Sequence, residues 1–218
     1  GVSGGVSRSA PKGNKIDGGT FSPGYLEGDA MNQLQTRHAE LSDIPSIEAL
    51  IEYSVTELMM REYSDEQRRL SIGALFGVDR KLIEDRTYFV VESDGVIAGC
   101  GGWSFRRKAF GGEAVANREA GCLDPATEAA HIRAFYVHPQ FARLGIATLL
   151  MKTSETAARE RGFTRLQLTA TLTGQHFYAK YGFQARERLD FLLPGDVRFP
   201  LVEMEFVCAE AERGGEPA

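Results

Sequence analysis

One junction between an apolar segment and an amphipathic segment constrains this chain more than any other stretch. Residues 131–137 have the length and the aromatic and β-branched content of a strand. Behind Gly145, apolar residues recur at three- and four-residue spacing with charged residues between them, which predicts a helix that ends near Gly162. A short loop joins the two segments, so the sequence predicts a strand–loop–helix unit.

The loop in front of this helix has the character of an anion-binding site. The first backbone N–H groups of a helix have no partner inside the helix, and the helix dipole favours negative charge there. The loop is neither a Walker A sequence nor a dinucleotide-binding G-x-G-x-x-G sequence. We interpret it as a phosphate-binding loop, and the competing interpretation is a plain turn in which Gly145 only permits a tight bend.

The same loop resembles motif A of the GCN5-related N-acetyltransferases (GNAT), written V-x-P-x-x-[QR]-x-x-G-x-[GA]. In that family the loop amides hold the pyrophosphate of acetyl-coenzyme A. The Gln/Arg position of the motif is Ala142 here, and Arg143 follows one residue later. The positions that match the motif are Val137, Pro139, Gly145 and Ala147.

A second stretch strengthens this resemblance. Residues 174–183 contain Phe177, Tyr178, Gly182 and Phe183 in the spacing of the F-Y-x-x-x-G-F signature of the same family. A single aromatic residue in such a helix is more often a core residue than a functional one. Two signatures in order, about thirty residues apart, favour the family.

The resemblance implies a fold in which a central, mostly antiparallel sheet is splayed between its fourth and fifth strands. This is a mixed α/β arrangement in three layers, the acyl-coenzyme A N-acyltransferase fold, over residues 31–208. The sequence pattern agrees with it. Strands are expected at 34–39, 87–92, 96–103, 131–137, 166–171, 183–193 and 201–207, and helices at 44–58, 65–75, 146–160 and 174–182, with a long loop at 106–127.

The resemblance also implies which residues hold acetyl-coenzyme A as cosubstrate. Pantetheine would lie in the slot between the splayed strands, with main-chain contacts from Phe135 and Val137, and the Val137 N–H would stabilise the oxyanion. Tyr178 is also expected to contact acetyl-coenzyme A. The loop residues expected to bind the cofactor are Arg143, Leu144, Gly145, Ile146, Ala147 and Thr148.

Three residues are candidates for the acid–base chemistry of acetyl transfer to an amine. Tyr178 occupies the position of the family's general acid, and a phenol can protonate a departing thiolate. His131 and Glu128 lie near the start of the fourth strand, where family members often carry a base, and a histidine titrates near neutral pH. The sequence leaves open whether three further residues line the acceptor site, namely Arg133, Trp103 and Arg106.

The composition of the chain narrows the classes of molecule that it is expected to bind. The formal net charge is −5 and no cluster of Lys and Arg occurs, which argues against nucleic acid and is compatible with a small-molecule amine acceptor. No run of about eighteen apolar residues predicts a membrane span. Three separated cysteines and four histidines show no metal-ligand spacing, so we expect no metal and a cytoplasmic protein with reduced thiols.

Residues 1–30 are glycine- and serine-rich without apolar periodicity, so we expect a flexible or artificial leader there and a polar tail at 209–218.

The family resemblance leaves open whether the protein forms a homodimer. Two alternative functions stay open besides that of an N-acetyltransferase. One is an inactive acyl-coenzyme A sensor of the same fold, and the other is a flavodoxin-like protein, which the two expected hairpins do not favour.

Overall fold

Seven strands of the described residues, 34–107 and 121–208, form one mixed sheet in the computed structural model. Their order across the sheet is β1-β2-β3-β4-β5-β7-β6, and only the β4–β5 pair is parallel. The predicted mixed α/β class is therefore confirmed. The strands are β1 (Gln35–His38), β2 (Tyr88–Ser93), β3 (Val96–Ser104), β4 (Ala130–Val137), β5 (Arg165–Thr171), β6 (Gln184–Leu193) and β7 (Val197–Val207).

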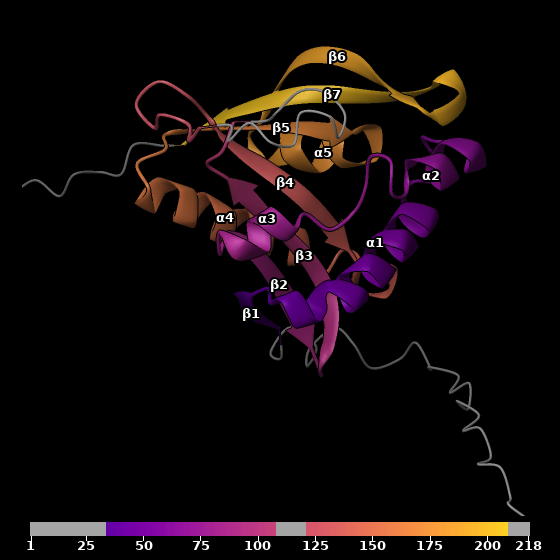
Figure 1. Ribbon diagram of the computed structural model, residues 1–218, viewed down its shortest axis with the longest axis horizontal. Helices are drawn as coiled ribbons and strands as arrows, with labels where there is room; N and C mark the ends of the chain where they lie inside the picture. Colours follow the sequence, from indigo (N-terminus) through magenta and orange to yellow (C-terminus); the bar gives the residue numbers. More distant parts are fainter. Residues whose placement is uncertain (1–33, 108–120, 209–218) are drawn as a thin grey trace, which may run out of the picture.

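Helices cover both faces of this sheet and make three layers (Figure 1). On one face lie α1 (Ile44–Leu58), α2 (Asp65–Ser71) and α3 (Arg80–Glu84), and on the other lie α4 (Ile146–Glu160) and α5 (Leu172–Tyr181). Each face has its own apolar core. Short 3-10 turns span Leu41–Asp43, Pro139–Phe141 and Pro194–Asp196. None of the helices in the described ranges is both long and apolar enough to cross a membrane.

Three expectations about elements were wrong in detail. Helix α2 ends at Ser71 rather than near residue 75, because Ile72 is extended and Gly73 has a φ of +80°. Helix α3 was not predicted, since five residues are too few to show a helical period. Strand β7 begins at Val197 and includes Pro200, which lies beyond the stretch where β5 pairs with β7, so its missing N–H removes no bond to β5.

The expected long loop at 106–127 lies between β3, which ends at Ser104, and β4, which begins at Ala130. Its two ends pair with each other, because Arg107 N–H donates to the Gly121 carbonyl at 3.1 Å and Leu123 N–H donates to Phe105 at 2.7 Å. Residues 108–120 lie outside the described residues, as do the expected leader at 1–30 and the tail at 209–218. The prediction of an acceptor wall in this loop therefore stays a prediction.

A β-bulge in β4 shapes the middle of the sheet. Gly102 pairs with Arg133 and Cys100 with Tyr136, so Gly101 alone stands opposite two residues of β4. Ala134 accommodates the extra residue with a φ of +55°. A Cβ at Gly101 would lie 2.6 Å from the Phe135 ring, so glycine is needed where this ring crosses β3.

Candidate active site

The parallel strands β4 and β5 separate soon after they meet. They pair only at Ala130 with Leu166 and at His131 with Gln167, although β5 runs on to Thr171 and β4 to Val137. The far edge of β5 is paired with β7 along its whole length, and the far edge of β4 with β3. The edges that face each other therefore leave backbone groups unpaired, and the predicted splay between the fourth and fifth strands is confirmed.

Strand alternation identifies the backbone groups that face this slot. His138 N–H donates to the Ala98 carbonyl of β3 at 2.9 Å. Because successive residues of a strand direct their N–H and C=O groups to opposite edges, Val137 and Phe135 direct theirs toward β5. These are the two residues for which the family resemblance implied main-chain contacts to pantetheine.

The loop between β4 and α4 ends in an uncapped helix N-terminus. Gly145 is the N-cap residue with a φ of +85°, it has no capping side chain, and its carbonyl accepts the first helical bond from Leu149 N–H at 2.9 Å. Arg143, two residues earlier, also has a positive φ of +72°. Left-handed residues of this kind turn neighbouring N–H groups to one side, which makes a concave site for an anion. A Cβ at Gly145 would meet no atom within 4 Å.

This geometry fits the phosphates that the sequence analysis assigned to the loop. The first N–H groups of α4 point out of the helix end without a capping side chain, and the dipole of a fifteen-residue helix adds to their attraction for negative charge. The loop itself is held by the His138 ring, whose Nδ1 accepts from Gln140 N–H at 3.3 Å. The Arg143 side chain is exposed beside it.

Helix α5 brings Tyr178 to the same side of the sheet as Phe135. The ring centroids of these two residues are 6.4 Å apart, and Phe177 and Phe183 lie 5.1 and 5.7 Å from Tyr178. Its hydroxyl has no hydrogen-bond partner within residues 34–107 and 121–208. Burial raises the pKa of the Tyr178 phenol, so this group is a neutral donor at physiological pH.

A residue that the sequence analysis missed fixes the start of α5. The Tyr63 hydroxyl accepts from Leu172 N–H and donates to the Pro200 carbonyl, both at 2.7 Å. Its ring stacks on Phe199 with centroids 4.0 Å apart. Burial raises the pKa of Tyr63 to about 12, so the phenol keeps the proton that it donates. Tyr63 lies between α1 and α2, more than a hundred residues from α5, and no local pattern indicates such a contact.

The two candidate bases line one cavity of about 400 Å³ at the closed end of the slot. His131 is the last residue of β4 that pairs with β5. Glu128 forms an ion pair with Arg107, with Nε 3.0 Å from Oε1, and accepts from Asp124 N–H at 2.7 Å. The Arg107 guanidinium and then the Asp124 N–H hold the pKa of the Glu128 carboxyl below its ordinary value.

The other residues considered for the acceptor site do not gather there. Arg133 pairs with Asp79 of the α3 cap at 2.8 Å, and Arg106 with Asp85 at 2.6 Å. Trp103 packs in the core beneath α4, the opposite face from His131. Among the described residues no group of three or more His, Cys, Asp or Glu side chains is placed to hold a metal ion.

Comparison with known sequences defines the class of this protein. The profile of the Acetyltransferase (GNAT) family matches residues 52–183, which is more than half of the chain. The chain therefore belongs to the GNAT acetyltransferase family. The match includes the β4–α4 loop and α5, the two elements that carry the motifs found in the sequence. No curated protein matches the chain significantly.

Solved structures agree on the fold. A GCN5-related N-acetyltransferase from Rhodopseudomonas palustris superposes with a TM-score of 0.61 at 21% identity, over 80% of this chain and 96% of that one. The PaiA N-acetyltransferase of Thermoplasma acidophilum, solved with coenzyme A, gives 0.57 at 15% identity, over 80% and 99%. YncA of Salmonella typhimurium, solved with its cofactor acetyl-coenzyme A, gives a TM-score of 0.53 at 15% identity, over 83% of this chain and 97% of that one.

Proposed function

We propose that this protein transfers an acetyl group from acetyl-coenzyme A to a primary amine of a small molecule or peptide. The observation that carries the proposal is the slot between β4 and β5, which has an uncapped helix N-terminus beside it and the Tyr178 hydroxyl on α5. Two proteins of similar fold have been solved with coenzyme A or acetyl-coenzyme A. Family membership supports the same chemistry.

In this proposal the cofactor lies along the free edge of β4. The backbone of Phe135 and Val137 pairs with pantetheine as a further strand would, and the amides of residues 143–148 hold the pyrophosphate. When bound, acetyl-coenzyme A supplies the thioester whose carbonyl the amine attacks. The Val137 N–H points into the slot and would donate to the oxygen that becomes negative in this attack.

Tyr178 has the role of proton donor to the leaving group. As the carbon–sulfur bond breaks, the sulfur gains negative charge, and a neutral phenol without another partner can donate its hydrogen bond there. Burial raises the pKa of a thiol as it raises that of a phenol. The departing thiolate is therefore a stronger base in this environment, and it can accept the phenol's proton. Phe135, Phe177 and Phe183 exclude water from this transfer.

His131 is the better of the two candidates for accepting the amine proton. Glu128 is already bonded to Arg107 and to a backbone N–H, and its lowered pKa makes it a weak base. A protonated imidazole cannot accept the amine proton. We expect kcat/KM to fall as the pH is lowered, and we expect His131→Gln to lose this dependence and about 10²-fold in rate.

Glu128→Gln is the matched control for this prediction, because it lines the same cavity and keeps the side-chain shape. It should keep the pH profile and change kcat/KM less than about threefold. The measurement is kcat/KM from pH 5.5 to 9 for the three proteins with one amine. The assignment of the base is wrong if the acid limb persists in His131→Gln and disappears in Glu128→Gln.

The test of the proposed function is release of free thiol from acetyl-coenzyme A in the presence of a panel of primary amines. An enzyme should release thiol in proportion to acetylated amine identified by mass spectrometry, with little release when the amine is omitted. An acyl-coenzyme A sensor would bind the cofactor in a calorimeter and release no thiol with any class of amine. The Tyr178 hydroxyl, free of protein partners among the described residues, favours the enzyme over the sensor.

A further inference from the structure

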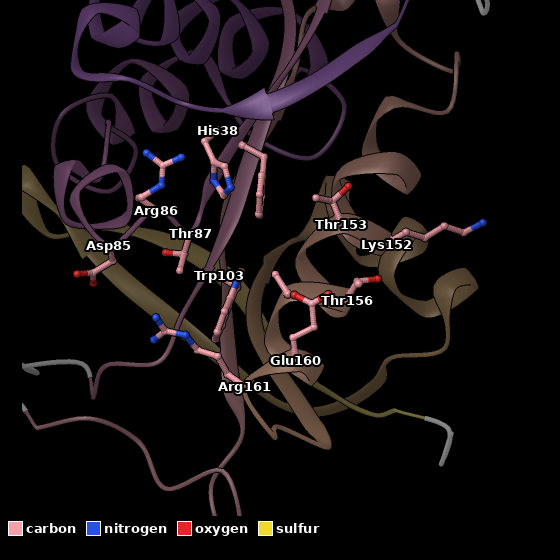
Figure 2. A pocket seen from close by; sticks show the side chains of 12 residues that line it. His38, Asp85, Arg86, Thr87, Trp103, Lys152, Thr153, Thr156, Glu160 and Arg161 are labelled. Atoms are coloured by element: carbon pink, nitrogen blue, oxygen red, sulfur yellow. The ribbon is translucent and has the colours of Figure 1, made fainter. Parts of the chain in front are cut away.

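A larger cavity, of about 710 Å³, lies between the sheet and the C-terminal half of α4 (Figure 2). We call it the α4 cavity. The residues of α4 in its wall run from Lys152 to Glu160, which places it about 9 to 21 Å along the helix from Ile146 at the phosphate-binding end. Its walls include His38, Thr87, Phe89, Trp103, Thr156 and Glu160.

Two polar atoms in the wall of the α4 cavity are buried without a hydrogen-bond partner among the described residues. They are the indole Nε1 of Trp103 and the Nδ1 of His38. Trp103 is only 1% exposed, and Figure 2 shows its indole nitrogen turned toward the space between Thr87 and Thr156. Leaving a buried N–H unpaired is costly, so nearly all such groups in proteins have a partner. A ligand with an acceptor oxygen would supply it.

The charges around the α4 cavity favour an anion. Arg86 lies on the wall opposite α4, whereas Lys152 and the C-cap residue Arg161 reach the cavity from α4 itself. The Asp85 carboxylate is already bound by Nε and Nη2 of Arg106 at 2.6 and 2.7 Å. Arg161 stacks 4.1 Å from the Phe105 centroid. Glu160 is the remaining carboxylate of the wall. Burial and then Arg86 lower the pKa of His38, so its imidazole is neutral.

One part of the wall is made of rings and a small apolar side chain. The rings of His38 and Phe89 lie 4.8 Å apart, and Ala157 faces them from α4. We propose that the α4 cavity binds a small organic carboxylate with a flat apolar body, one oxygen of which accepts a hydrogen bond from the Trp103 indole N–H. The site is separate from the slot between β4 and β5, so it does not depend on the proposed acetyl transfer.

Trp103 is the only tryptophan of the chain, which makes the test direct. A ¹⁵N-labelled protein has one indole N–H resonance, and titration with sodium phenylacetate should move it downfield along a saturable curve. Phenylacetamide has the same shape without the charge and benzylamine carries the opposite charge, and both should bind at least about tenfold more weakly. An unmoved indole resonance, or binding of either control as tight as that of phenylacetate, overturns the proposal.

Variants separate the α4 cavity from nonspecific binding. Thr156→Phe fills the space and should abolish phenylacetate binding, whereas Thr56→Phe, on the exposed side of α1, should leave it unchanged. Glu160→Gln removes the opposing charge and should tighten binding several-fold. Trp103→Phe, read by calorimetry, should weaken binding about tenfold or more because it removes the donor. Wild-type affinity in Thr156→Phe, with its fold confirmed by circular dichroism, excludes this cavity as the site.

Discussion

Replacing Tyr178 by phenylalanine should lower kcat by about 10²- to 10⁴-fold and leave the KM for acetyl-coenzyme A nearly unchanged. The ring packs among Phe135, Phe177 and Phe183, and phenylalanine keeps those contacts. What is lost is a hydroxyl with no partner among the described residues, so the folded state gives up no hydrogen bond. A fall in kcat alone means that the hydroxyl acts in the transition state. Steady-state kinetics at saturating amine measure it.

Tyr181→Phe is the matched control on the same helix. The Tyr181 hydroxyl donates to Glu155 of α4 at 2.6 Å, so it has a structural partner and lies outside the proposed chemistry. Its loss should change kcat less than about threefold while lowering the melting temperature by a few degrees. If Tyr178→Phe retained full kcat, the proton donor to the leaving thiolate would have to be another group or water. Tyr178 would then serve only the packing of α5.

The parts of this fold that follow from local pattern were predicted from the sequence. The strand–loop–helix unit at 131–160 has strong periodicity on both sides of Gly145, and the glycine has the positive φ that a tight entry into α4 requires. Order along the chain and two family motifs then indicated the splayed sheet. The uncapped N-terminus of α4 and the pairing of β4 with β5 agree with that interpretation.

The parts that depend on distant contacts were not predicted. The bulge at Ala134 reverses which face of the sheet the following residues of β4 point to, and it brings the Phe135 ring against Gly101 on another strand. Tyr63 ties the segment after α1 to the first turn of α5, although nothing near it in sequence distinguishes it from a core aromatic. The sequence left open whether Trp103 lines the acceptor site, and strand register turns its side chain to the face of the sheet opposite His131.

Replacing Gly145 by aspartate should weaken acetyl-coenzyme A binding about 10³-fold. A Cβ there meets no atom within 4 Å, so the side chain has room and the chain should fold. The carboxylate would stand where the pyrophosphate is expected. At about 4 Å and an effective dielectric constant of about 20, two like unit charges repel by about 4 kcal/mol, which is about a thousandfold in the dissociation constant. Titration calorimetry with acetyl-coenzyme A measures it.

Gly145→Asn separates charge from conformation, because the φ of +85° strains both substitutions and Asn and Asp are the two side chains that tolerate it best. Asparagine has the shape of aspartate without the charge and should weaken binding less than about tenfold. Raising the salt concentration should recover part of the loss in Gly145→Asp and little of that in Gly145→Asn, since salt screens exposed charges. Equal, salt-independent losses in both variants would mean that the loop conformation alone matters. Wild-type affinity in Gly145→Asp would place the phosphates elsewhere and remove the main support for a cofactor at the N-terminus of α4.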